Sequence, residues 1–290
     1  MEELRYSDGD VEVIVLPEAG ARFHRLRAFG HDLLRTPDDP DTHHRDPFFW
    51  GAYVMAPWGG RVEARPTIVG SRTVDLAANF RDGTAIHGQV YDRPWTMAGD
   101  GSLRIRGGDD GWPWPYEVSM RIEVADATVR IELALTNLAE DRMPAGIGIH
   151  PWFRRPIQVA IHADRVHTSN TASTPEPESV SGAHDLRALG EMADDLDATW
   201  TDLVDPPVEL RWPRAGIAAT IRVTTPSDYI VAASPGEIDA IAVEAQTHAP
   251  QGLRRMLGGE PGGLTWLEPG ESLELVVGLA VERVTDGQRI

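Results

Sequence analysis

The stretch "YEVSMRIEVADATVRIELALTN", Tyr116–Asn137, alternates apolar and polar residues in two successive runs. Side chains that alternate with period two lie on opposite faces of a strand. Both runs are rich in β-branched residues, and Asp or Asn bounds each of them. We therefore predict one strand at Tyr116–Val124 and a second at Thr128–Asn137.

The same pattern extends outward from this stretch in both directions. Five further runs are predicted as strands: Val11–Pro17, Leu103–Gly107, Val208–Trp212, Ile217–Thr224 and Ser272–Val284. The 28 glycines and 22 prolines suit a fold with many turns. Helical patterns are scarce, although His184–Leu203 is predicted to hold a helical turn or two. The polar, proline-bearing segment Asn170–Asp185 is predicted to be a long loop.

These patterns predict an all-β protein, a large antiparallel β-sandwich formed as a single domain over residues 1–290. At 41% hydrophobic and 25% charged residues, the chain has enough apolar side chains for a sizeable core. No apolar run approaches the roughly 20 residues that a membrane-spanning helix needs. The N-terminus "MEELRYSDGD" has no secretion signal, so we expect a cytoplasmic protein that does not engage a membrane.

Charge and composition exclude several classes of function. A net charge of −18, with no basic run interleaved with aromatic residues, predicts no binding to nucleic acid. The chain has no cysteine, which rules out a thiolate nucleophile and a cysteine-ligated metal. It also has no lysine, because all 27 basic residues are arginine, which rules out Schiff-base chemistry. We expect a neutral small molecule as the partner.

Five polar side chains interrupt the apolar β pattern and are the candidates for a site. They are Arg61 in "MAPWGGRV", His87 in "IHGQVYDRPW", His150 in "IHPWF", Asp197 in "LDATW" and Glu244 in "IAVEAQT". Each also has a purely structural interpretation: an exposed ion pair for the arginine, a hydrogen-bonded core position for either histidine, a turn cap for the aspartate, and a solvent-facing strand position for the glutamate. In a functional interpretation, Glu244 is a general base and His150 a general acid.

Four tryptophans, Trp58, Trp95, Trp152 and Trp200, lie within a few residues of these polar groups. Flat aromatic faces beside hydrogen-bonding side chains suit a sugar, although core packing is the usual position of tryptophan. Adjacent histidines in "THHRD" make a poor metal site, and a dispersed site using His87 and His150 lacks the expected histidine-x-histidine pair.

Taken in order, these segments resemble the aldose 1-epimerase (galactose mutarotase-like) family. The resemblance rests on "LPEAGARFHRLRAFGHDLLR", "MAPWGGRV", "IHGQVYDRPW", "GIHPWF", "LDATW", "VEAQT" and "LEPGESLEL", which together cover nearly the whole chain. It implies a large β-sandwich with an open sugar cleft, no cofactor and no metal. The function that it implies is the interconversion of α and β anomers of a free aldose, by a monomer or homodimer.

The resemblance also implies a role for each candidate residue. Glu244 takes the proton of the anomeric hydroxyl, and His150 protonates the ring oxygen. His87, Arg61 and Asp197 then hold substrate hydroxyls. We expect Trp152 and Trp58 to stack on the sugar or to form the cleft wall, with Phe153 supporting it. Mutual proximity is expected to favour the charged forms of the acid and the base.

Two positions depart from the family pattern, because Gly60 and Ile149 stand where many members have asparagine. The resemblance therefore does not specify a particular sugar. One alternative function is a hexose-6-phosphate 1-epimerase, in which Arg154 and Arg155 bind the phosphate. Another is a non-catalytic sugar-binding protein on the same scaffold.

Overall fold

The computed structural model describes residues 1–171, 176–224 and 228–284, and this part of the chain is built almost entirely from β-strands. All seven predicted strands are present, three of them with the predicted bounds, and the all-β prediction is confirmed. No helix among these residues has the length and apolar character needed to cross a membrane.

The main sheet joins seventeen strands of the described residues. They are β1 (Leu4–Asp8), β2 (Val11–Leu16), β3 (Arg22–Ala28), β4 (His31–Asp32), β5 (Ala52–Met55), β10 (Thr96–Met97), β11 (Leu103–Gly107), β12 (Tyr116–Ala125), β13 (Thr128–Asn137), β15 (Gly148–Arg154), β16 (Gln158–His167), β17 (Glu178–Ser179), β18 (Asp197–Trp212), β19 (Ile217–Thr224), β20 (Tyr229–Ala233), β21 (Ala240–Gln246) and β23 (Ser272–Arg283).

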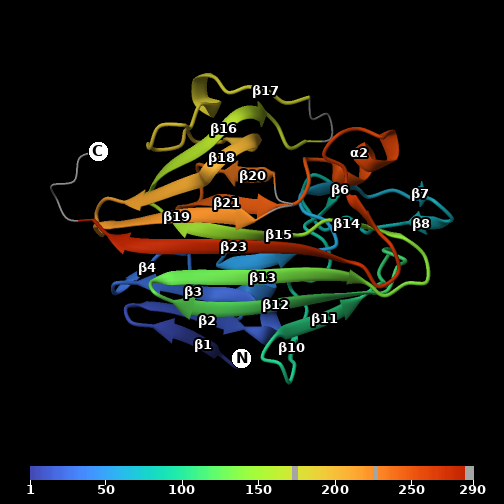
Figure 1. The fold of residues 1–290 in the computed structure, drawn as a ribbon, viewed down its shortest axis with the longest axis horizontal. Coiled ribbons are helices and arrows are strands. Elements are labelled where there is room, and N and C mark those ends of the chain that lie inside the picture. The colour runs from blue at the N-terminus through green and yellow to red at the C-terminus, as the bar shows by residue number, and fades with distance from the viewer. Residues whose placement is uncertain (172–175, 225–227, 285–290) are drawn as a thin grey trace.

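Smaller elements gather at one end of the molecule, around β6, β7 and α2 in Figure 1. Three two-stranded sheets pair β6 (Arg61–Glu63) with β9 (Thr84–Ile86), β7 (Thr67–Val69) with β8 (Arg72–Val74), and β14 (Met143–Ala145) with β22 (Thr265–Leu267). The helices are short: α1 (Thr42–Arg45), α2 (Gly252–Gly258), and the 3₁₀ turns η1 (Pro17–Ala19) and η2 (Gly182–His184).

The main sheet curls into two layers of antiparallel strands. In one layer, β13 pairs with β12 and β23, and β23 pairs with β19. In the other, β15 lies between β5 and β21, and β20 pairs with β21. The long strand β18 joins the layers, because its C-terminal part pairs with β19 and its N-terminal part with β20. Figure 1 shows β12, β13 and β23 side by side across the molecule.

The hydrophobic core lies between these layers, as expected for a sandwich. Val129 of β13 and Val277 of β23 line a small internal cavity together with Ile149 and Phe153 of β15 and Val243 of β21. All five side chains are buried. Side chains on the other face of β15 and β21 therefore point away from this core, and the candidate site lies there.

The prediction of helical turns within His184–Leu203 is wrong. The 3₁₀ turn η2 ends at His184, and β18 begins at Asp197. Trp200 is fully buried, and β18 pairs with β16 on one side and β20 on the other, so sheet pairing decides the conformation here. Of the predicted loop Asn170–Asp185, residues 172–175 lie outside the described residues, and Glu178–Ser179 forms β17.

Candidate active site

Strand alternation brings the predicted acid and base to one face of the sheet. In β15, Ile149 and Phe153 face the core, so His150 and Trp152 face outward into a pocket. In β21, Val243 faces the core and Glu244 points outward into the same pocket. The two strands are antiparallel neighbours, which places the imidazole beside the carboxylate. The cavity has a volume of about 290 Å³.

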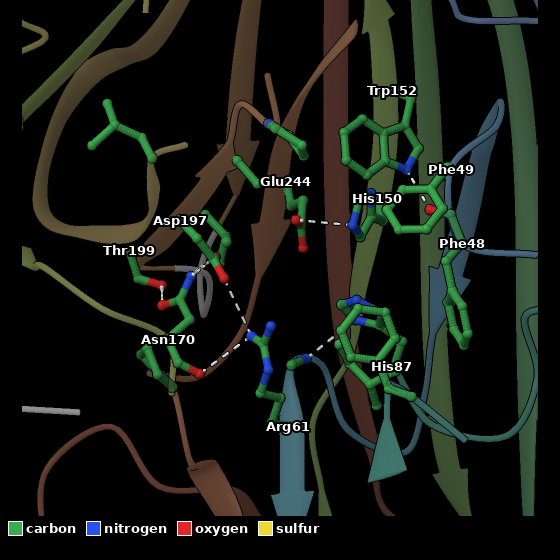
Figure 2. Close-up of a pocket in the computed structure, with 18 of the residues that line it drawn as sticks. Phe48, Phe49, Arg61, His87, His150, Trp152, Asn170, Asp197, Thr199 and Glu244 are labelled. Carbon is green, nitrogen blue, oxygen red and sulfur yellow. Dashed lines mark hydrogen bonds and ion pairs between the residues drawn. The ribbon is translucent and has the colours of Figure 1, made fainter. Parts of the chain in front are cut away.

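His150 and Glu244 contact each other directly, with 3.1 Å between His150 Nε2 and Glu244 Oε1. Figure 2 shows this contact at the centre of the site. Both side chains are buried, at 5% and 4% exposure. Burial raises the pKa of Glu244 well above its usual value, and the nearby Asp197 raises it further. Burial also lowers the pKa of His150 to about 3.

Both shifts favour the neutral forms, which contradicts the expectation that proximity favours the charged ones. Burial is the largest cause of each shift, because desolvation penalises a carboxylate and an imidazolium alike. The neutral and ionised forms of the pair differ only in where one proton lies: on Glu244 in the neutral form and on His150 in the ionised form. Transfer of this proton along the hydrogen bond interconverts the two forms. His150 can thus receive the proton that an acid needs while Glu244 becomes a base.

His87 lies beside the pair in a fixed orientation. Its backbone has a φ of +61°, which is uncommon outside glycine. Its Nδ1 accepts a hydrogen bond from the Gly60 N–H at 3.3 Å, so the neutral ring carries its hydrogen on Nε2. Burial and the nearby His150 hold the pKa of His87 well below its usual value. His87, whose ring meets that of His150 edge-on at 4.9 Å, is therefore a neutral hydrogen-bond donor.

Arg61 and Asp197 form the polar side of the pocket together with a residue that the sequence did not single out. Arg61 Nη1 lies 3.3 Å from an Asp197 carboxylate oxygen and 3.3 Å from the Asn170 carbonyl. Asn170 Nδ2 donates to Asp197 at 2.6 Å, and Thr199 Oγ1 donates to the Asn170 amide oxygen at 2.7 Å. The Asn170 amide is thereby fixed and orients the Asp197 carboxylate. No motif distinguished Asn170 from other polar residues of its segment.

Aromatic side chains form the opposite side of the pocket, as Figure 2 shows. Phe48 and Phe49, both half-buried, line it together with Trp152 and Phe80. The indole N–H of Trp152 donates to the Phe48 carbonyl, which ties this loop to β15. Sequence reasoning did not select Phe48, Phe49 or Phe80, because aromatic residues outside a regular pattern give no sign of facing a pocket.

Two aromatic residues expected in the cleft wall are in the core instead. Trp58 is fully buried and packs on Trp112 at 5.0 Å between ring centres, outside the pocket. Phe153 packs on Trp212, because odd-numbered residues of β15 face the core. Trp95 and Trp200 are likewise buried outside the pocket lining.

The basic side chains around the pocket are already paired with carboxylates. Arg61 contacts both Asp82 and Asp197, and Arg81 lies 4.0 Å from Glu237. Arg154 and Arg155 do not line the pocket, and Arg155 pairs with Asp194. In the part of the chain that the structure describes, no three His, Asp or Glu side chains are grouped to hold a metal ion.

Comparison with known proteins gives one consistent result. The chain matches the aldose 1-epimerase family over residues 3–279. It is 23% identical over 259 residues to the uncharacterized protein YphB of Escherichia coli K12, covering 79% of this chain and 83% of that protein.

Solved structures show the same fold. A galactose mutarotase-like protein from Clostridium acetobutylicum has a TM-score of 0.82 at 16% identity, covering 97% of this chain and 95% of that one. A GalM/aldose epimerase homologue from Caenorhabditis elegans has a TM-score of 0.81 at 16% identity, with 98% and 99% covered.

Proposed function

The chain belongs to the aldose 1-epimerase family, and on this premise we propose that it is an aldose 1-epimerase that needs no cofactor and converts the α and β anomers of a free aldose into each other. The observation that carries the proposal is the buried contact between His150 and Glu244 on the wall of a sugar-sized pocket. A hemiacetal has a hydroxyl and a ring oxygen on one carbon. These two oxygens can face the carboxylate and the imidazole together.

In the proposed reaction, Glu244 takes the proton of the anomeric hydroxyl while His150 Nε2–H donates its proton to the ring oxygen. The bond between C1 and the ring oxygen breaks, and the electron pair of the former O–H bond forms the aldehyde. Rotation about C1–C2 then presents the other face of the aldehyde. On ring closure, protonated Glu244 gives its proton to the carbonyl oxygen and His150 takes the proton of the attacking hydroxyl, so both groups end in their starting states. Each positioned acid or base contributes on the order of 10²–10⁴-fold to the rate.

The remaining side chains would orient the sugar. The fixed Nε2–H of His87 lies beside His150 and can donate to the ring oxygen. Arg61 and Asp197 offer a donor and an acceptor to neighbouring hydroxyls. The aromatic side of the pocket, with Phe48, Phe49 and Trp152, suits the C–H faces of a sugar ring.

Two observations favour a free aldose over the alternatives. The arginines that line the pocket are paired with carboxylates, and Arg154 and Arg155 lie outside it, so the described residues leave no unpaired arginine there to bind the phosphate of a sugar phosphate. Burying a carboxyl group and an imidazole side by side costs desolvation free energy, and sugar binding alone does not require such an acid–base pair.

Polarimetry on freshly dissolved α-D-glucose and α-D-galactose tests the proposal, with wild type beside Glu244→Gln and His150→Ala. A second pair, His162 and Glu209, lies on the surface with 3.6 Å between His162 Nε2 and Glu209 Oε1, and the variants His162→Ala and Glu209→Gln are matched controls. We expect the wild type and the controls to accelerate mutarotation, and both site variants to lose the acceleration. A wild type that leaves these sugars, other free aldoses and hexose 6-phosphates at the buffer rate would contradict the proposal.

A further inference from the structure

Arg22, on β3, is a buried cation that the proposed reaction does not use. Its side chain is fully buried. Nη1 donates to the Trp50 carbonyl at 2.8 Å and Nη2 to the Tyr91 carbonyl at 3.0 Å, while Nε has no partner in the described chain. Asp46 and Asp92 act on it electrostatically, but neither forms an ion pair with it. A buried guanidinium without a contacting carboxylate is costly, which calls for an explanation.

The Arg22 side chain stands directly behind the proposed acid. Its Cζ lies 4.6 Å from the centre of the Tyr53 ring. The Tyr53 ring in turn stacks on His150, with 4.6 Å between ring centres and 23° between planes. Guanidinium, phenol ring and imidazole therefore form a continuous column that ends at the contact with Glu244.

Arg22 also belongs to a set of donors that hold the aromatic loop of the pocket. Three successive carbonyls of this loop accept hydrogen bonds: Phe48 from the Tyr53 hydroxyl, Phe49 from Arg35 and Trp50 from Arg22. Gly51 follows with a φ of +66°, and a Cβ there would lie 2.3 Å from the Phe23 carbonyl. The loop that carries Phe48 and Phe49 is thus fixed from behind.

We propose that Arg22 is a positioning residue for the acid–base pair, which holds the Tyr53 ring against His150 and supplies a permanent positive charge behind it. This inference rests on the proposed role of His150 as the acid. Burial lowers the pKa of Arg22 to about 10, so the guanidinium stays charged at neutral pH. The cation–π contact with Tyr53 compensates part of the desolvation cost.

The positive charge of Arg22 opposes the addition of a second proton to the His150–Glu244 pair. Three titratable groups face His150: Glu244 from β21, His87 from the loop after β9 and Tyr53 from β5. Behind Tyr53 lie further titratable groups, which are Arg22, Tyr91, Asp46 and Asp92. After burial itself, the charge of Arg22 contributes to the lowered pKa of His150. A doubly protonated pair has no base. Arg22 therefore keeps Glu244 available at lower pH and makes protonated His150 a stronger acid.

NMR of the imidazole ¹⁵N resonances of His150 in the sugar-free protein tests the electrostatic role, with the signals assigned by their absence in His150→Gln. The variants are Arg22→Gln, which removes the charge, and Arg22→Lys, which keeps it. Arg255→Gln is the matched control, because Arg255 is equally buried and donates to the Pro261 carbonyl but lies on α2, outside the pocket lining. The titration needs no substrate, so its result does not depend on whether the protein is a mutarotase.

We expect protonation of His150 to begin about one pH unit higher in Arg22→Gln than in wild type, and at the wild-type pH in Arg22→Lys and in the control. The acid limb of the pH–rate profile should move by the same amount. If protonation of His150 began at the same pH in Arg22→Gln and wild type, or occurred in neither over the pH range in which the protein stays folded, the electrostatic role would be overturned.

If Arg22→Gln does not fold, Tyr53→Leu tests the stacking instead. We expect kcat to fall at least tenfold in this variant, and an unchanged kcat overturns the proposal.

Discussion

Among the described residues, two histidine–glutamate pairs lie within 4 Å, and they differ in their surroundings. His150 and Glu244 are 3.1 Å apart, and both side chains are about 95% buried. His162 of β16 and Glu209 of β18 are 3.6 Å apart, with side-chain exposures of 31% and 45%. Both pairs bridge neighbouring antiparallel strands, so strand pairing alone does not make a site.

The difference lies in what covers each pair. The outer face of β15 and β21 is enclosed by Tyr53, Trp152 and the loop with Phe48 and Phe49, so water is largely excluded from the inner pair. An exposed pair is hydrated and screened, and contributes little to binding or stability. Burial shifts the pKa values of His150 and Glu244 and fixes their geometry, and strongly shifted pKa values in a pocket are typical of functional sites.

The largest effect is expected for Glu244→Gln, which keeps the shape and removes the base. We expect kcat for mutarotation to fall about 10³-fold. In contrast, Glu209→Gln should stay within about twofold of wild type. Polarimetry at saturating sugar measures both, and a similar loss in the two variants would abolish the distinction between the pairs.

His150→Ala should cost somewhat less, about 10²-fold in kcat, because His87 remains beside the ring oxygen as a hydrogen-bond donor. The double variant with Glu244→Gln should be hardly slower than Glu244→Gln alone, because the two groups act as one unit. Single-turnover polarimetry compares the three variants. Multiplicative losses would mean that the acid and the base act independently.

Asn170→Ala tests whether the polar side of the pocket depends on the orientation of Asp197. The variant removes the 2.6 Å hydrogen bond to that carboxylate, and we expect KM to rise about tenfold with kcat within about threefold of wild type. Thr199→Ser keeps the hydroxyl that holds the Asn170 amide and is the matched control. A drop in kcat at constant KM in Asn170→Ala would assign it a different role.

The smallest change is expected when pH is lowered from 6 to 4. Because burial lowers the pKa of His150 to about 3 and raises that of Glu244, the pair should keep its single proton, and kcat/KM should change by less than about twofold. A pair with ordinary pKa values would lose most of its ionised carboxylate by pH 4. A severalfold fall over this range, with the fold intact, would show that the pair is solvated.

Burial lowers the pKa of two histidines outside the pair, His43 to about 2 and His248 to about 4, and these shifts predict the direction of acid destabilisation. In the unfolded chain histidine titrates near its ordinary value, about 6.5, so below that value the unfolded state binds protons at these two sites that the folded state does not. The free energy of unfolding should therefore decrease from pH 6.5 downward. Urea titrations followed by near-ultraviolet circular dichroism at each pH check this and report the range in which the activity assay is valid.

Local sequence patterns predicted the strands well and the covering elements poorly. The bounds of β11, β13 and β19 agree with the alternating runs, because period-two burial is written directly into those residues. The predicted helical turns before Leu203 were wrong, because pairing with β16 and β20 makes the second part of that segment a strand. Non-local pairing leaves no mark in a short window of sequence.

The candidate site shows the same division. Glu244 and His150 stood out as polar residues inside apolar strands, and strand alternation explains why both face the pocket. Asn170 and the Phe48–Phe49 loop did not stand out, because their position depends on contacts with Asp197 and Trp152 that are distant in sequence. Trp58 looked equally suitable for a cleft wall, but its ring packs on Trp112 in the core.

Local features of the sequence, its period-two patterns and its isolated polar residues, were enough to predict an all-β protein of the aldose 1-epimerase family with Glu244 and His150 as candidates for an acid–base pair. Only the folded chain shows that these two side chains touch, that Arg22 lies behind them and that Asn170 orients Asp197. Contact and burial arise only when strands distant in the chain pair, and burial determines the pKa values on which the proposed chemistry depends.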